Sequence, residues 1–155
     1  MKAGRRTVLA AGLLAGLAKA APSADEQDQA LAADTDYAAG RAALKAGQFD
    51  TARLRFQAAL RRFPEAADLH NELGFTYRKL RQMDLAFEHY KRALTIDPRH
   101  RGAHEYIGEA YLMVGDVAGA EKHLAALRAI CLLPCEELED LRRAIEEHQA
   151  NAKAR

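Results

Sequence analysis

Small and apolar residues return along the chain with a period of 34 residues. Six positions of the period keep their character through three successive copies, and chance rarely preserves so many registers. The matching sets are Gly40, Gly74 and Gly108; Ala52, Ala86 and Ala120; Phe56, Tyr90 and Leu124; Ala39, Leu73 and Ile107; Ala43, Tyr77 and Tyr111; and Ala59, Ala93 and Leu127. Each copy is therefore predicted to be one structural unit, and stacked units are predicted to share a continuous core.

Glycine and proline divide each copy into two helices. Gly47 and Gly115 lie between the helices of a pair, where a left-handed backbone suits glycine. Pro64 and Pro98, 34 residues apart, end a copy and stop the helix. The pattern predicts an all-α fold with helices at about 34–46, 50–62, 67–80, 84–96, 101–114 and 117–130.

The pattern also predicts how the chain is divided. The expected parts are a signal peptide at 1–20, a flexible leader at 21–32, three repeats at 33–66, 67–100 and 101–134, a capping helix at 135–150 and a frayed tail at 151–155. The capping helix is expected because Leu138, Leu141 and Ile145 share one helical face, which would cover the apolar side of the last pair.

The repeat resembles that of the tetratricopeptide-repeat (TPR) family. The second copy carries the family pattern best, in Leu73-Gly74-x-x-Tyr77, Ala86, Tyr90, Ala93-Leu94 and Asp97-Pro98. Where the family has its first bulky residue, this chain has Asp36, His70 and His104, and we expect the two histidines to replace a packing Trp. The resemblance implies an α-solenoid of three TPR helix-turn-helix repeats with a C-terminal capping helix. It also implies a protein-binding role without enzymatic activity.

The resemblance further implies that the first helix of each pair lines a concave groove for a peptide or a partner helix. The predicted partner-binding residues are Tyr37, Arg41, Lys45, Asn71, Phe75, Arg78, Lys79, Glu105, Glu109, Leu112 and Met113. Arginine and lysine of the first two copies are expected to form a basic end, and the two glutamates an acidic end. Such a surface suits a partner of opposite polarity. The alternative is that these charges form only a solvated helix face.

Cys131 and Cys135 are the only cysteines of the chain. Four residues apart on a helix, their Cα atoms would lie about 6 Å apart, within the range of a disulfide. A bridge would tie the last repeat to the capping helix. Two free thiols, a copper site and a thiol redox site are the alternatives.

The sequence predicts no cofactor and no catalytic site. The motifs H-E-x-x-H, G-x-S-x-G, the P-loop and the dinucleotide fingerprint are absent. His70 and His104, like His89 and His123, hold equivalent positions in neighbouring copies, about 10 Å apart by ordinary helix spacing and thus too far for one metal ion. No metal site is therefore predicted.

The N-terminus has the layout of a secretory signal. A basic start at Lys2, Arg5 and Arg6 precedes an apolar run, Val8 to Ala18, and cleavage is expected after Ala20. The run is shorter than the about 20 residues that a spanning helix needs. The protein is therefore expected in the periplasm or outside the cell. An uncleaved anchor and a twin-arginine signal remain alternatives.

Cleavage would also change the charge. Of 23 basic residues, loss of four would leave 19 against 22 acidic ones, a formal charge of −3, which argues against general nucleic-acid binding. The sequence thus predicts a non-enzymatic protein–protein interaction module. One alternative is an assembly factor for periplasmic redox enzymes or c-type cytochromes. Another is a copper-delivery or thiol-redox protein that uses the C-x3-C pair.

Overall fold

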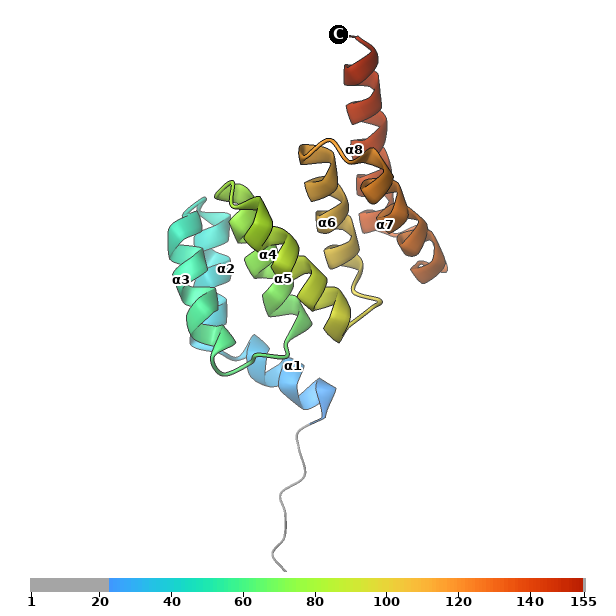
Figure 1. The fold of residues 1–155 in the computed structure, drawn as a ribbon. Coiled ribbons are helices and arrows are strands. Elements are labelled where there is room, and N and C mark those ends of the chain that lie inside the picture. Colours follow the sequence, from blue (N-terminus) through green and yellow to red (C-terminus); the bar gives the residue numbers. More distant parts are fainter. Residues whose placement is uncertain (1–22, 155) are drawn as a thin grey trace, which may run out of the picture.

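The computed structural model describes residues 23–154, which form eight helices and no strand (Figure 1). They are α1 (Ala24–Ala32), α2 (Thr35–Lys45), α3 (Phe49–Leu60), α4 (Ala67–Lys79), α5 (Met83–Ile96), α6 (Arg101–Met113), α7 (Val117–Ile130) and α8 (Glu136–Lys153). The predicted all-α fold is confirmed, and α2 to α7 begin and end within two residues of the predicted bounds. The expected signal peptide and its cleavage site lie outside the described residues.

Consecutive helices pack as three pairs, α2 with α3, α4 with α5 and α6 with α7, and the pairs lie side by side (Figure 1). Short turns join the two helices of each pair. Gly47 and Gly115 adopt φ of 69° and 81°, so the predicted left-handed turns are confirmed. Arg81 holds the same place in the second pair with φ of 63°, although it is not glycine.

Glycine lets the helices approach one another closely. A Cβ atom on Gly40 would lie 2.5 Å from the Phe56 ring, and one on Gly74 would lie 2.5 Å from the Tyr90 ring. Real Cβ atoms do not come so close to an aromatic ring, so a larger residue would force each pair apart. The third copy differs, because a Cβ on Gly108 would meet Leu141 of α8 at 2.7 Å. The last helix thus inserts a side chain where the first two pairs pack within themselves.

The buried side chains form two clusters. The larger one runs from Leu31 of α1 through α2 to α6 and includes Phe56, Leu69 and Tyr90. The smaller one joins α6, α7 and α8 through Leu112, Leu127, Leu141 and Ile145. Leu141 and Ile145, predicted for the inner face of the capping helix, are buried at 0% and 5% exposure.

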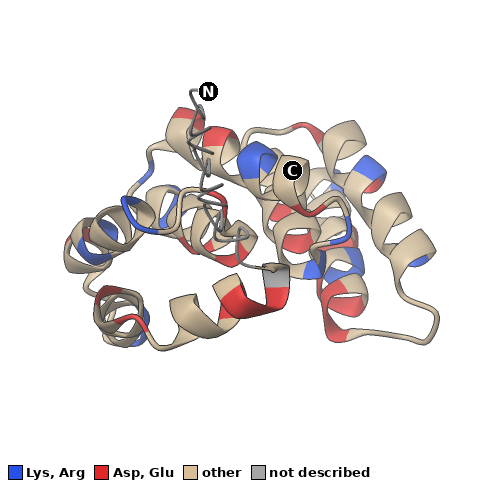
Figure 2. Ribbon diagram, turned by 90° about the horizontal axis from the view of Figure 1, so that it is seen from below, with Lys and Arg blue, Asp and Glu red and all other residues tan. Residues whose placement is uncertain are grey.

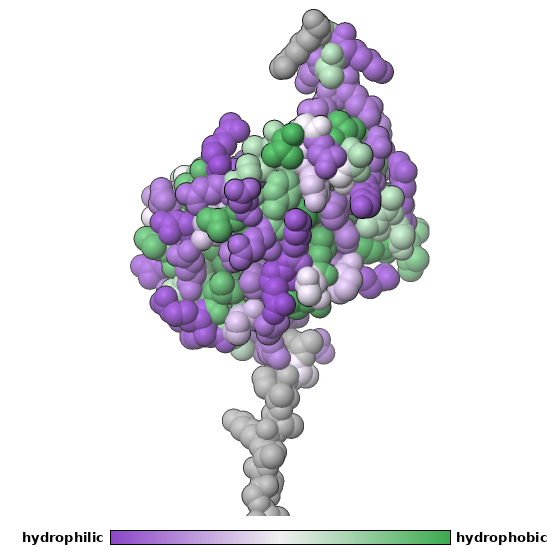
Figure 3. All heavy atoms as spheres, in the orientation of Figure 1, coloured by the Kyte–Doolittle hydropathy of each residue, from purple (hydrophilic) through white to green (hydrophobic). Residues whose placement is uncertain are grey.

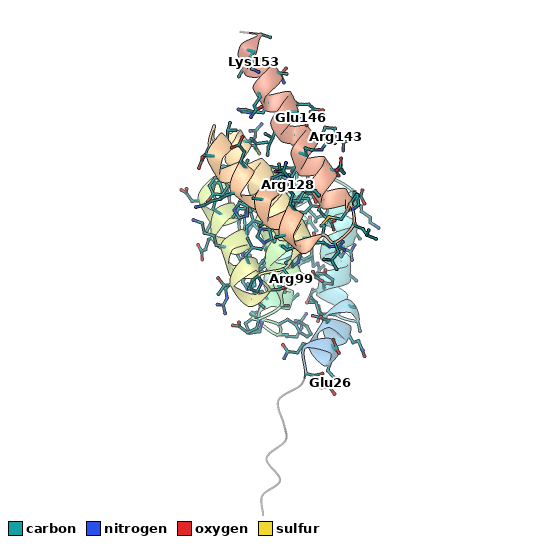
Figure 4. All side chains as sticks on the ribbon, turned by 90° about the vertical axis from the view of Figure 1, so that its right-hand side faces the viewer. Glu26, Arg99, Arg128, Arg143, Glu146 and Lys153 are labelled. Atoms are coloured by element: carbon teal, nitrogen blue, oxygen red, sulfur yellow. A yellow bond between two sulfur atoms is a disulfide. The ribbon has the colours of Figure 1, made fainter. Side chains whose placement is uncertain are left out.

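Both ends of the described chain differ from the expectation. Residues 24–32, expected to be part of a flexible leader, form α1, because Ser23 and Glu26 make a capping box and Leu31 is buried. At the other end α8 continues to Lys153, into the tail that was expected to fray. Its last turns extend past α6 and α7 (Figure 1), and Arg143, Glu146 and Lys153 follow one another along it (Figure 4).

A disulfide connects the ends of two helices. Cys131 ends α7, Cys135 begins α8, and their Cα atoms are 6.1 Å apart. The bridge fixes the direction in which the chain leaves the third pair. Between residues 23 and 154, no helix has the length and apolar character to cross a membrane.

Candidate functional site

The first helices of the three pairs, α2, α4 and α6, together line a hollow of about 260 Å³. Its walls are Arg41, Leu44, Lys45, Glu72, Phe75 and Tyr106. Three of these, Arg41, Lys45 and Phe75, were predicted from the sequence. The structure therefore brings side chains from all three repeats to one concave surface, which we call the groove.

Aromatic rings and cations make up the centre of the groove. The ring centroids of Phe75 and Tyr106 are 5.2 Å apart. The guanidinium of Arg78 lies 5.3 Å from the Phe75 centroid, and the ammonium of Lys79 lies 5.1 Å from it. Each distance is within the range of a cation–π interaction. The rings thus carry positive charge above an apolar floor.

The arginines of the groove are already paired within the molecule. Arg41 lies 3.6 Å from Glu72, and Arg78 lies 2.6 Å from Glu109. The second pair is the stronger, because the Arg78 side chain is only 9% exposed and loses little of the interaction to water. The expected separation into a basic end and an acidic end is therefore only partly correct. Lysines 45 and 79 are exposed, whereas both arginines are neutralised.

Glu105 stands apart from these pairs. It lies on α6 and is half-buried, and no described residue forms an ion pair with it. Burial raises the pKa of Glu105 to about 8, with a further contribution from the neighbouring carboxylates of Glu109, Asp140 and Glu137. At neutral pH most of this carboxyl is therefore protonated.

Four of the predicted site residues are buried. Tyr37, Asn71, Arg78 and Leu112 are 7 to 8% exposed. For Leu112 the prediction is wrong, since it packs against α7 and α8 in the smaller core cluster. The spacing placed it on the groove face, but α8 covers that part of α6. Met113 is 46% exposed at the end of the same helix.

Histidines pair inside the second and third repeats. The Nδ1 atoms of His70 and His89 are 3.0 Å apart, and those of His104 and His123 are 2.9 Å apart. His70 Nε2 lies 3.0 Å from the carbonyl oxygen of Pro64, which can only accept, so Nε2 carries the hydrogen. His70 Nδ1 is then the acceptor and His89 Nδ1 donates. These pairs join the two helices of one repeat, a contact that the sequence comparison of neighbouring repeats missed.

Each pair is backed by a tyrosine. The ring of His89 stacks on Tyr77 with centroids 5.3 Å apart, and His123 stacks on Tyr111 at 5.7 Å. Burial lowers the pKa of both His89 and His123 to about 4, and the paired histidine lowers it further in each case. Both rings are therefore neutral at neutral pH. The expectation that His70 and His104 serve packing agrees with this arrangement.

The model of the tetratricopeptide-repeat family matches residues 37–101, which span α2 to α5 and reach the start of α6. The chain is a TPR protein. The match begins at Tyr37 of the groove and includes one complete histidine pair. No curated protein matches the chain.

Solved structures share the fold over most of the TPR protein. The Arabidopsis OM64 TPR domain is 16% identical, with a TM-score of 0.67 over 79% of this chain and 98% of that one. The type III secretion translocator chaperone SycD of Yersinia enterocolitica is 21% identical, with a TM-score of 0.63 over 83% and 91%. PcrH, in complex with the chaperone-binding region of PopD, is 25% identical, with a TM-score of 0.64 over 84% and 96%. The helical-repeat architecture is thus established.

The prediction omitted two residues of the TPR groove, Glu72 and Tyr106. Both hold the same position of the repeat, one residue after Asn71 and Glu105. The helical stripe chosen from the sequence excluded that position, yet Tyr106 meets Phe75 and Glu72 meets Arg41. An aromatic residue in the first turns of a groove-lining helix is the signal that could have found Tyr106.

Charge and apolar surface are mixed over the rest of the TPR protein. Basic and acidic residues occur on many of its helices (Figure 2), and apolar patches alternate with hydrophilic ones on one face (Figure 3). The largest exposed apolar side chains are Leu132 and Leu133 in the disulfide loop, at 94% and 80%. Within residues 23–154, no three His, Cys, Asp or Glu side chains come together as metal ligands.

Proposed function

We propose that this TPR protein is a non-enzymatic adaptor that binds an extended peptide or a helix of a partner protein in its groove. The observation that carries the proposal is the hollow lined jointly by α2, α4 and α6. Its apolar floor would hold side chains of the partner, and the polar groups around it would fix the partner's position. TPR proteins are generally interaction modules, and PcrH, one of the similar structures, holds a segment of PopD.

The size of the groove indicates a transient complex. Its contact surface spans three short helices, and interfaces of about 1,000 Å² in total are typical of weak and transient complexes. The exposed Lys45 and Lys79 would meet acidic or polar groups of the partner at its rim. Charges at the rim change the rate of association more than the final affinity. We therefore expect fast binding that weakens as the salt concentration rises.

A photocrosslinking residue in the groove tests the proposal. Replacement of Lys45 by a benzophenone amino acid should yield a discrete crosslinked partner, because Lys45 lines the hollow. The matched control carries the same residue at Leu54, which is 58% exposed on α3, outside the groove lining. Equal crosslinking at both positions, or none at Lys45, would contradict binding in the groove.

We also propose that the protein is exported. The support comes from the signal-like N-terminus and from the Cys131–Cys135 bridge, because disulfides persist mainly in oxidising compartments. Reduction should lower the free energy of unfolding by about 2 kcal/mol, as expected for so small a loop. Thiol counting on fractionated cells tests both points. Two free thiols, or a cytoplasmic protein with its N-terminus intact, would contradict the proposal.

A further inference from the structure

Glu105 is the groove carboxylate that lacks a counter-ion among the described residues. The acids on either side of it are paired, Glu72 with Arg41 and Glu109 with Arg78. The nearest cation of α4 is Arg78, and Glu109 already holds it at 2.6 Å. The groove therefore contains one more negative group near α6 than its own cations neutralise.

The groups that face Glu105 come from three helices. Glu109 lies on α6 itself, Glu137 and Asp140 lie on α8, and Arg78 reaches in from α4. Arg101 and Arg143 pair with Glu137 and Asp140. No neighbouring side chain is therefore left to neutralise Glu105. A positive charge from another molecule would relieve both its burial and the repulsion by its neighbours.

A second acceptor lies at the same boundary between α4 and α6. Asn71 is 8% exposed, and its Oδ1 atom has no hydrogen-bond partner. A Cβ on Gly102 would lie 3.4 Å from Asn71 Nδ2, so the amide points at the first turn of α6. Gly102 precedes Glu105 by one helical turn. Buried acceptors without a partner are rare in proteins and cost about 1–3 kcal/mol each.

The two acceptors call for the same kind of ligand. Asn71 and Glu105 are 34 residues apart and hold equivalent positions of adjacent repeats. A carboxylate and an amide oxygen both accept hydrogen bonds, and neither can be satisfied by a partner's carboxylate. Guanidinium supplies five N–H donors and one positive charge in a fixed plane, so it can reach more than one acceptor.

We infer that the groove recognises an arginine side chain of its partner protein, with Glu105 as its counter-ion and Asn71 Oδ1 as a second acceptor. This inference rests on the proposed function, because it assigns chemistry to a partner in that groove. It makes the positive residue the specificity determinant, in contrast to the acidic groups expected to meet Lys45 and Lys79. The partner segment then carries opposite charges at its two ends.

Binding of arginine should be linked to loss of a proton. The free Glu105 carboxyl has a raised pKa of about 8, and a bound guanidinium favours its ionised form. Affinity for an arginine peptide should therefore increase as the pH rises from 7 to 9. Full release of one proton across this range corresponds to an increase of about tenfold. Arginine itself stays charged throughout, so the titrating group is on the protein.

An array of peptides tests the inference on the full chain. The probes are 12-residue peptides in matched pairs, identical except for arginine or neutral citrulline at one central position. We expect arginine to bind at least tenfold more tightly at pH 8.5, and the preference to disappear in Glu105→Gln. Glu88→Gln, an exposed change on α5, should keep it. Citrulline peptides should bind equally to all three proteins.

The outcomes separate the inference from the proposed function. Peptides that bind in the groove with no preference for arginine would overturn the inference and leave the function intact. A preference that persists in Glu105→Gln would overturn it as well. If no peptide of the array binds, both are contradicted. Circular dichroism of Glu105→Gln checks the fold, which should not weaken, because the change removes a partly buried charge.

Discussion

The first repeat and the two that follow it solve one structural problem in different ways. In each repeat a side chain near the start of the first helix meets one that lies 19 residues later on the second helix. In the first repeat Arg55 donates to Asp36 at 3.2 Å, in an ion pair whose arginine is 55% exposed. In the second and third repeats the same positions hold the neutral histidine pairs.

The surroundings explain the difference. His89 and His123 stack on Tyr77 and Tyr111, whereas the equivalent residue of the first repeat is Ala43, which offers no ring. The inner histidines also donate to the carbonyl oxygens of Pro64 and Pro98. The first repeat has no proline in that position. An exposed ion pair serves where water is near, and a neutral hydrogen bond serves where burial would penalise charge.

Acid should separate the two kinds of pair most strongly. The pKa of His89 and of His123 is about 4 in the folded protein and about 6.5 in the unfolded chain. Between these values the unfolded chain binds more protons, so stability is complete above pH 6.5 and falls as the pH falls to 4. With half of each shift discounted for solvent screening, the two histidines together should cost about 3–4 kcal/mol.

Urea unfolding at several pH values measures this loss. The control is His89→Gln with His123→Gln, in which an amide can still donate to the partner ring but cannot titrate. Its stability should change less between pH 6.5 and 4. Glu105 acts in the opposite sense, because its raised pKa makes protonation favour the folded state. Both proteins contain Glu105, so its contribution cancels in the difference. Identical pH profiles would contradict the assigned role of the pairs.

Truncation at neutral pH should give the next largest contrast. His89→Ala removes the stacking on Tyr77 and leaves the buried Nδ1 of His70 without a donor, at a cost of about 2–3 kcal/mol. The matched change in the first repeat, Arg55→Ala, breaks only an exposed ion pair and should cost less than about 1 kcal/mol. Denaturant unfolding measures both values. Equal losses would mean that the histidine pair is not a buried contact.

The turns between paired helices give the smallest expected effect. Arg81 adopts the left-handed backbone that Gly47 and Gly115 adopt in the other repeats. This conformation costs about 1–2 kcal/mol for a residue with a Cβ, while glycine loses more entropy on folding. Arg81→Gly should therefore stabilise the protein by about 0.5 kcal/mol, seen as a small rise in Tm. Gly115→Ala should lower the Tm, and a fall in both variants would contradict the strain at Arg81.

The sequence predicted the helices well, because their signals are local and repeated. Gly47, Gly115, Pro64 and Pro98 each carry a backbone requirement that holds in any surroundings. The disulfide could also be foreseen, since the spacing of Cys131 and Cys135 alone brings them within range. Helix α1 was missed because its capping box lies in a polar segment with few apolar residues.

The candidate site was harder to predict, because its chemistry depends on distances between repeats. That Arg41 and Arg78 are neutralised depends on Glu72 and Glu109, which lie on the neighbouring helices. The burial of Leu112 depends on α8, which lies outside the repeat pattern. The histidine pairs were missed because only equivalent residues of different repeats were compared. Periodicity identifies the faces of helices but does not show which side chains meet across them.

The central claim is that partners bind on the surface formed by α2, α4 and α6. Backbone amide NMR of the full chain, titrated with the tightest arginine peptide of the array, tests it most directly. We predict that the largest shift changes fall on these three helices, around Lys45, Phe75 and Glu105. Changes concentrated on α3, α5 and α7, or on Leu132 and Leu133, would contradict the account.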